Sequence, residues 1–259
     1  IITILSENRT PSKSLAYILV LIFLPVVGII IYIMVGRKPV FKKISFGKKR
    51  IRDRKKMELY FKKIEPLMQQ RLGLLEHKIG DLALPFNYLY RQKESLISTN
   101  NSVKLLNNGE EKFPELYRAL ENATSYIHIE YYIFSYDDVG NAVTDILIRK
   151  KKEGVDVRII VDDVGSNKMG NIPNRLKESG ITLLRTQPVT FTSLANSNYR
   201  NHRKIVIIDG KTGFIGGINL DDRYLNNGKH KLYWRDTAVR IDGNAVKILE
   251  VHFFLSWLF

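Results

Sequence analysis

The run NHRKIVIIDGKTGFIGGIN, residues 201–219, holds two apolar segments joined by an Asp-Gly step. Asp209-Gly210 between apolar runs is a strong hairpin signal, so the run predicts two antiparallel strands. Because side chains alternate between the faces of a strand, His202 and Lys204 should point the same way and Arg203 the other way. An imidazole beside an ammonium suits attack on a phosphate, since the lysine binds the anion and favours the neutral imidazole. Such chemistry needs no metal.

The residues upstream of this run alternate between strand and helix patterns. Segments rich in β-branched and aromatic residues predict strands at 103–106, 125–134, 155–161 and 181–184. Amphipathic segments predict helices at 114–123, 139–153 and 172–179, and 107–109 predicts a turn. With the hairpin added, this order predicts a mixed-sheet α/β domain.

The composition is that of a globular protein with a local excess of positive charge. The 259 residues are 44% hydrophobic, carry a net charge of +15 and include no cysteine. The lack of cysteine excludes disulfides, thiolate zinc sites and cysteine nucleophiles. Between Arg37 and Lys63 the chain has 13 Lys and Arg against two acidic residues, and the rest is nearly balanced. The charge therefore indicates a basic patch, and no nucleic-acid partner is expected.

Residues 14–36 (SLAYILVLIFLPVVGIIIYIMVG) contain no charged residue. A helix of this length reaches about 34 Å, enough to cross a bilayer core, and it lacks the short apolar region and cleavage site of a signal peptide. A buried core helix is the alternative. The basic segment that follows predicts a cytoplasmic location for everything downstream of it. This segment either attracts anionic lipids or only determines the orientation of the chain in the membrane. Apolar residues 1–5 suggest the end of an earlier span, which would make a hairpin.

Three regions follow from this pattern. We expect a transmembrane region at 1–36, a basic juxtamembrane linker at 37–100 and a catalytic α/β domain at 101–259. Both ends of the sequence look cut, so we expect a piece of a longer protein.

The spacing His202-x-Lys204-x4-Asp209, then six residues and Gly216-Gly217-x-Asn219, resembles the motif of the phospholipase D superfamily at every position. With the apolar N-terminus, the basic linker and the runs HIEYYIF (128–134) and YWRDTAVRIDG (233–243), essentially the whole chain is similar to the bacterial cardiolipin synthases of that superfamily.

The resemblance implies a two-step transfer through a phosphohistidine, with no cofactor and no metal. His202 would attack the phosphorus of a phosphatidyl group and expel glycerol, while Lys204 and Asn219 would hold the phosphate oxygens. A second histidine would protonate the leaving group and then deprotonate the acceptor hydroxyl. The expected partners are phosphatidylglycerol and anionic membrane lipids, and the expected location is the bacterial inner membrane, with multiple spans and a cytoplasmic catalytic domain.

Two carboxylates have different expected roles. Asp209 belongs to the motif, but it lies at the turn and on the face opposite His202, so we expect it to be structural. Asp236 follows the Gly-Gly-x-Asn turn, where the resemblance implies an acidic residue that orients the histidine. A surface pair of Arg235 with Asp236 is the alternative.

The remaining candidates are less specific. Glu130 lies on a predicted core strand and could be the buried partner of a lysine or support the site from behind. The other histidines lack the partner spacing and are expected to be structural or on the surface; they are His77, His128, His230 and His252.

The chain has one His-Lys-Asp motif, whereas the resemblance implies two in one active site. The second would come from a missing C-terminal domain or from dimerisation. Three functions remain open: a phosphatidyltransferase that condenses two phosphatidylglycerols to cardiolipin and glycerol, a phospholipase D-type hydrolase or membrane-tethered nuclease, and a non-catalytic lipid-binding half-domain.

Overall fold

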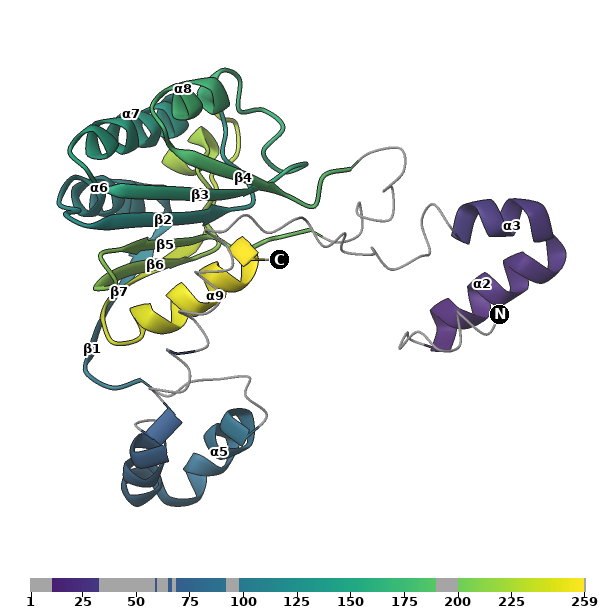
Figure 1. The fold of residues 1–259 in the computed structure, drawn as a ribbon, viewed down its shortest axis with the longest axis horizontal. Coiled ribbons are helices and arrows are strands. Elements are labelled where there is room, and N and C mark those ends of the chain that lie inside the picture. Colours follow the sequence, from purple (N-terminus) through teal and green to yellow (C-terminus); the bar gives the residue numbers. More distant parts are fainter. Residues whose placement is uncertain are drawn as a thin grey trace.

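A computed structural model describes residues 11–32, 59, 65–66, 69–91, 98–189 and 200–258. Its centre is a seven-stranded mixed sheet in the order β1-β7-β6-β5-β2-β3-β4 (Figure 1). β2, β3 and β4 are parallel, and the other neighbouring pairs are antiparallel. The strands are β1 Asn101–Asn107, β2 Tyr126–Tyr131, β3 Asp156–Asp162, β4 Thr182–Thr186, β5 Ile205–Ile208, β6 Thr212–Gly216 and β7 Thr237–Gly243.

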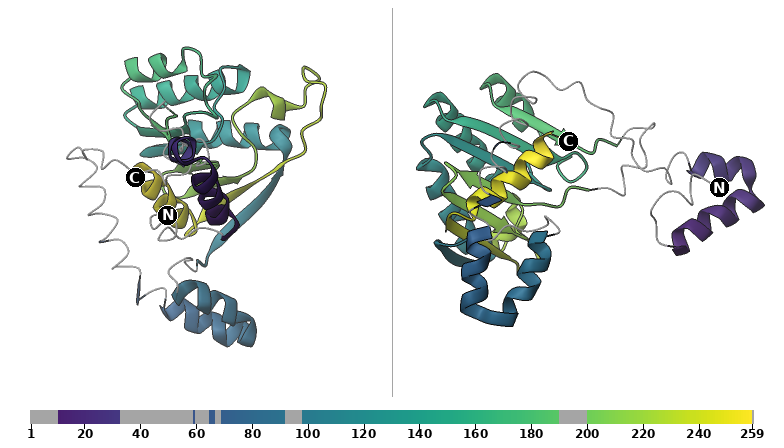
Figure 2. Two further views of the ribbon diagram at one scale, coloured as in Figure 1. Left: turned by 90° about the vertical axis from the view of Figure 1, so that its right-hand side faces the viewer. Right: turned by 60° about the horizontal axis from the view of Figure 1, so that its bottom comes forward.

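Helices cover both faces of the sheet. On one face lie α6 Asn108–Glu121, α7 Asp138–Lys152 and α8 Ile172–Glu178, and on the other lies α9 Val246–Leu258 (Figures 1 and 2). The larger core fills the first face, and a smaller cluster around Phe253 and Trp257 fills the second. The short 3-10 helix η4 Asp222–Leu225 follows β6. The mixed α/β fold predicted from the sequence is confirmed.

Local sequence accounts for the helix boundaries. Asp137 caps α7 by accepting a hydrogen bond from the Gly140 amide at 2.9 Å. The predicted turn at 107–109 and the predicted start of the helix at 114 are both wrong, because α6 begins at Asn108 and includes Gly109. The Glu111 carboxylate accepts from the Asn107 amide at 2.8 Å, which stabilises this earlier start, and Pro114 lies within the helix.

The N-terminal apolar segment forms two helices, α2 Pro11–Phe23 and α3 Pro25–Ile31. They are separated at Leu24 (φ −136°, ψ 68°), since a residue before proline is disfavoured in the helical conformation. α3 packs against α2, with the rings of Tyr17 and Tyr32 5.8 Å apart. None of the helices in the described ranges combines the length and apolar character needed to cross a membrane. The spanning helix predicted at 14–36 is therefore not confirmed, and its residues 33–36 lie outside the described ranges, as does most of the basic segment.

The predicted linker is partly helical where it is described. Residues 69–79 form a helix, followed by η2 Gly80–Ala83 and α5 Leu84–Arg91.

Candidate active site

One edge of the sheet collects the motif residues. β2 and β3 end at this edge, β5 begins there, and the antiparallel order brings the end of β6 and the start of β7 to it. Segments distant in sequence therefore meet around His202: residues 131–135, 162–166, 200–204, 216–219 and 236.

His202 and Lys204 are in direct contact. Lys204 Nζ lies 2.9 Å from His202 Nδ1 and donates to the His202 carbonyl oxygen at 2.8 Å. The predicted placement of both residues within a strand is wrong, because β5 begins only at Ile205. The predicted proximity of the two side chains is nevertheless present, with His202 exposed and Lys204 only 4% exposed.

Burial and the neighbouring charges tune this pair. Burial lowers the pKa of His202 and the charge of Lys204 lowers it further, while Asp162 acts in the opposite direction. Burial lowers the pKa of Lys204 to about 8, against the opposing effect of Asp236. The imidazole is therefore largely neutral near pH 7, whereas most of Lys204 is charged. A neutral nucleophile beside a cation suits attack on a phosphate ester.

Asp236 lies beside the glycines of the motif and not beside the imidazole. Its carboxylate packs on Gly217, where an added Cβ would lie 2.1 Å from Oδ1, so any larger residue there would displace the carboxylate. The carboxylate interacts with the charges of Lys204 and Lys112, and among the described residues no hydrogen bond joins it to His202. The orienting role predicted for Asp236 is thus not seen in this geometry. The alternative surface pair is not seen either, because Arg235 donates to the Asp236 carbonyl oxygen and not to its carboxylate.

Lys112 is a member of this cluster that the sequence did not reveal. It is 2% exposed, lies over the Tyr131 ring and donates to the Ile218 carbonyl oxygen at 2.7 Å. Burial lowers its pKa to about 7; Asp236 opposes this effect and Lys204 adds to it. Lys112 lies four residues before the buried Leu116, on the same face of α6, and a lysine on an apolar helix face indicates a special role. The helix predicted at 114–123 does not include Lys112.

Asn219 is buried and held in place by two hydrogen bonds. Its Oδ1 accepts from the Ile133 amide at 3.1 Å, and its Nδ2 donates to the Tyr224 hydroxyl at 3.0 Å. An amide nitrogen has two donor hydrogens, so one remains for a ligand. The phosphate contact predicted for Asn219 would have to use that hydrogen.

Asp209 lies at the opposite end of β5 from this site. Its carboxylate accepts four hydrogen bonds, from the Thr124 amide and hydroxyl and from the amides of Ser125 and Tyr126, at 2.8–3.0 Å. The residue adopts φ +53° in the hairpin turn. These contacts agree with the structural role expected for it: the carboxylate ties the hairpin to the start of β2.

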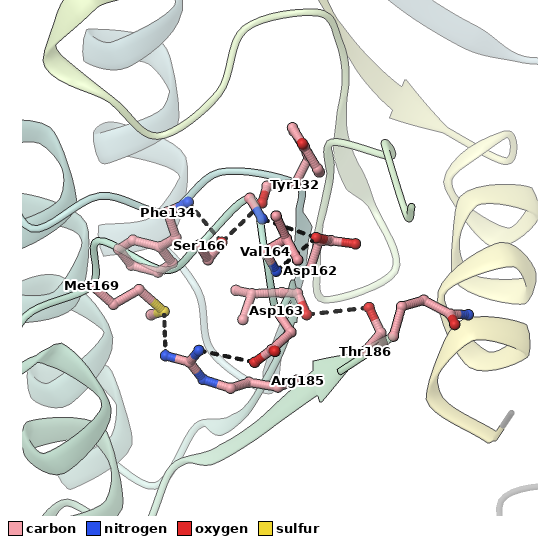
Figure 3. A network of polar contacts seen from close by, with 12 residues as sticks. Tyr132, Phe134, Asp162, Asp163, Val164, Ser166, Met169, Arg185 and Thr186 are labelled. Carbon is pink, nitrogen blue, oxygen red and sulfur yellow. Dashed lines mark hydrogen bonds and ion pairs between the residues drawn. The ribbon is translucent and has the colours of Figure 1, made fainter. Parts of the chain in front are cut away.

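Asp162 fixes the segment that carries His202, and the sequence did not predict it. Its side chain is fully buried at the end of β3, where it binds the turn that follows through the amides of Val164 and Gly165. It also accepts from the Asn201 amide at 3.0 Å and from Arg200 at 3.1 Å. Figure 3 shows Asp162 among the polar contacts of this edge. A single buried carboxylate thus joins the β3 turn to the residues just before the histidine.

Two residues of β2 and its extension complete the surroundings of His202. The Tyr132 ring lies 4.6 Å from the imidazole, centre to centre, and 5.4 Å from Lys204 Nζ. Glu130 accepts from Asn201 Nδ2 at 2.6 Å and lies 3.7 Å from Arg203, so it supports the site from behind, and its cationic neighbour is an arginine and not the predicted lysine. Arg203 also bonds Ser256 of α9, on the side away from Lys204.

The other histidines lie apart from the Lys204 pair. His128 is buried and stacks on Phe253, whereas His77 and His230 are exposed and His252 is half-buried. Within the described ranges, no group of three or more His, Cys, Asp or Glu side chains is arranged to hold a metal ion.

Comparison with known proteins identifies similar chains. Residues 116–253 match the family "Cardiolipin synthase, PLD-like domain", and residues 1–37 match "Phospholipase_D-nuclease N-terminal". A cardiolipin synthase of Alkalihalophilus pseudofirmus is 40% identical over 99% of this chain, and the probable cardiolipin synthase YwiE of Bacillus subtilis is 38% identical over 99%. The chain spans about half the length of these curated relatives, 50% in both cases.

A solved structure is also similar. The phospholipase D family member Nuc from Salmonella typhimurium is 22% identical, with a TM-score of 0.49, and the match covers 61% of this chain and 95% of Nuc.

Proposed function

This chain belongs to the family described as "Cardiolipin synthase, PLD-like domain", and from that premise we propose that it supplies one half of the active site of a membrane-bound phosphatidyltransferase. The reaction joins two phosphatidylglycerols into cardiolipin and releases glycerol. The observation that carries the proposal is the contact of Lys204 with His202, placed at the sheet edge by residues with the motif spacing. The relatives named above are cardiolipin synthases, which supports the same substrate class.

The proposed reaction has two displacement steps. In the first, a ring nitrogen of His202 bonds to the phosphorus of one phosphatidylglycerol, and the bond from phosphorus to the glycerol headgroup oxygen breaks. Glycerol leaves with a proton from a second histidine. In the second, a hydroxyl of another phosphatidylglycerol gives its proton to that second histidine and displaces His202, which forms cardiolipin. The second histidine belongs to the other half of the site, supplied by a further domain or a second chain.

Lys204 has two proposed tasks in the first step. When it is charged it donates to Nδ1 of His202, which leaves the imidazole proton on Nε2 and no lone pair there. An arriving phosphate competes for the ammonium. Once Lys204 turns to the phosphate oxygen, the imidazole can carry its proton on Nδ1 and present the Nε2 lone pair to phosphorus. The lysine thus couples substrate binding to activation of the nucleophile.

The proposed setting is the bacterial inner membrane. Residues 1–36 would form a membrane region with more than one span, 37–100 a basic linker and 101–259 the cytoplasmic catalytic half. The match of residues 1–37 to a phospholipase D-nuclease N-terminal family supports this division.

The function is tested by supplying labelled phosphatidylglycerol to purified full-length protein. We expect cardiolipin and glycerol in equal amounts, because each transfer releases one glycerol. Both products are measured by chromatography, with and without a metal chelator. Phosphatidic acid as the main product would instead identify a hydrolase, and cleavage of DNA a nuclease.

The activity should depend on the protonation of Lys204. With a pKa of about 8, this lysine loses its charge as the pH rises through 8, so we expect kcat/KM to fall above that value. The charge of Asp236 raises the pKa of Lys204, so Asp236→Asn should move this alkaline limb to lower pH. Asp163→Asn is the matched control and should leave the limb in place, because Asp163 pairs with Arg185. An unchanged limb in Asp236→Asn would show that another group controls it.

A further inference from the structure

Four strongly exposed apolar side chains lie at the same sheet edge as the candidate site. They form what we call the apolar rim: Tyr136, Val164, Leu232 and Tyr233, with exposed fractions of 51%, 41%, 70% and 65%. Large exposed aromatic and aliphatic side chains that share one edge of a domain are candidates for an interaction surface.

The rim lies on both sides of the candidate site. Leu232 and Tyr233 belong to the loop that enters β7, whereas Tyr136 and Val164 follow the ends of β2 and β3. The His202–Lys204 pair lies at the start of β5. In the sheet, β5 stands between β7, next to the first group, and β2 and β3, next to the second group, so the pair lies between the two groups. A flat surface that touched both groups would therefore cover the site.

Hydrogen bonds and close packing hold the two tyrosines of the rim in place. The Tyr233 hydroxyl donates to Glu110 at 3.1 Å and accepts from Asn108 at 2.8 Å, which leaves the ring to face solvent. The Tyr136 ring packs so closely on Gly170 that an added Cβ there would lie 2.7 Å from it. The loop that bears Leu232 projects beyond the sheet (Figure 2, left).

Each half of the rim has an exposed cation beside it. Lys231 adjoins Leu232. Lys168 lies beside Tyr136, because the Lys168 carbonyl oxygen accepts a hydrogen bond from the Tyr136 amide at 2.8 Å. Neither lysine forms an ion pair within the described part of the chain, whereas Lys229 is paired with Asp138. Apolar side chains with unpaired lysines next to them match the interface of a bilayer that contains anionic lipid.

We propose that the apolar rim seats this domain on a bilayer surface containing anionic lipid, with the His202–Lys204 edge toward the lipid. This proposal rests on the proposed function, since a phosphatidylglycerol headgroup must reach His202 from the membrane. Seating both halves of the rim brings the site to the headgroup layer, so the substrate need not leave the bilayer entirely.

The test uses the absence of cysteine from the 259-residue chain. Leu232→Cys in the full-length protein, with any cysteine outside these 259 residues replaced by serine, gives one labelling site for an environment-sensitive fluorophore, and Leu105→Cys is the control. Leu105 is 59% exposed on β1, where its side chain lies on the face of the sheet and not at the site edge. Both proteins are reconstituted into vesicles of phosphatidylglycerol and phosphatidylcholine that contain nitroxide-labelled lipid.

We expect a blue-shifted emission at position 232 and at least threefold stronger quenching there than at position 105. Adding Lys231→Glu should reduce the quenching in these vesicles and have little effect in phosphatidylcholine alone. Equal quenching at both positions, or water-like emission at 232, would overturn the proposal. A blue shift at 232 without vesicles would indicate a protein partner and overturn it as well.

The readout separates this proposal from the proposed function because it needs no turnover. A quenched label at 232 in a full-length protein that makes no cardiolipin contradicts only the function. An active full-length enzyme with an unquenched label contradicts only the rim.

Discussion

Replacing His202 with alanine is expected to lower cardiolipin formation by roughly 10⁴-fold or more, because loss of a nucleophile removes the covalent route altogether. The imidazole is exposed and its ring contacts are with Tyr132 and Lys204, so its removal should leave the fold intact. Labelled glycerol released from phosphatidylglycerol by the full-length protein measures the rate. Circular dichroism checks the fold.

His77→Ala is the matched control, since His77 is an exposed histidine on the helix at 69–79. It should retain activity close to that of the parent protein. Turnover in His202→Ala within tenfold of the parent would rule out the phosphohistidine route. Detection of a trapped phosphoenzyme in the His202→Ala variant would also rule out His202 as the residue that is phosphorylated.

Replacing Asp162 with alanine is expected to cost about 3–5 kcal/mol of folding free energy, the range for removal of one partner from a buried charged pair. The carboxylate is fully buried and accepts from Arg200 and from three backbone amides, and these amides would lose this acceptor. Activity should fall as well, since Asp162 holds the residues just before His202. Urea unfolding measures the first effect, and the cardiolipin assay at a temperature where the variant stays folded measures the second.

The adjacent residue provides the control for this experiment. Asp163 is half-buried and pairs with the exposed Arg185 at 3.1 Å. Surface ion pairs contribute less than about 1 kcal/mol, so Asp163→Ala should be nearly neutral. If both substitutions lowered the free energy of unfolding equally, the buried contacts of Asp162 would stabilise the fold no more than the surface pair of Asp163 does.

Much of the fold could be predicted because its signals are local. Strand composition, the Asp-Gly turn and helix-terminating glycines each act over a few residues, and the sheet matches them, with β5 and β6 on either side of Asp209-Gly210. The motif spacing also brought His202 and Lys204 together. The start of α6 could not be predicted in this way, because proline is typical of the first turn of a helix and Pro114 therefore indicates a later start. The contact of Glu111 with the Asn107 amide, which stabilises the earlier start, is seen only in the structure.

The surroundings of the site could not be predicted, because they depend on contacts between distant segments. Asp162 meets Asn201 across 39 residues, and Lys112 meets Ile218 across 106. Nothing near either residue in the sequence indicates its partner. Asp236 was expected to bond His202, but strand pairing places its carboxylate over Gly217, beside the lysines.

The pairing of β1 with β7 has a consequence for how the protein is made. Asn101 opposes Gly243, so the first strand of the sheet finds its partner in the last. During synthesis β1 must remain without its neighbour until nearly 140 further residues have emerged, and contacts of such long range form slowly. Until then the backbone N–H and C=O groups of β1 lack the partner strand that the folded sheet provides. A ribosome that pauses before residue 237 would therefore hold an incomplete sheet, without the strand that closes it.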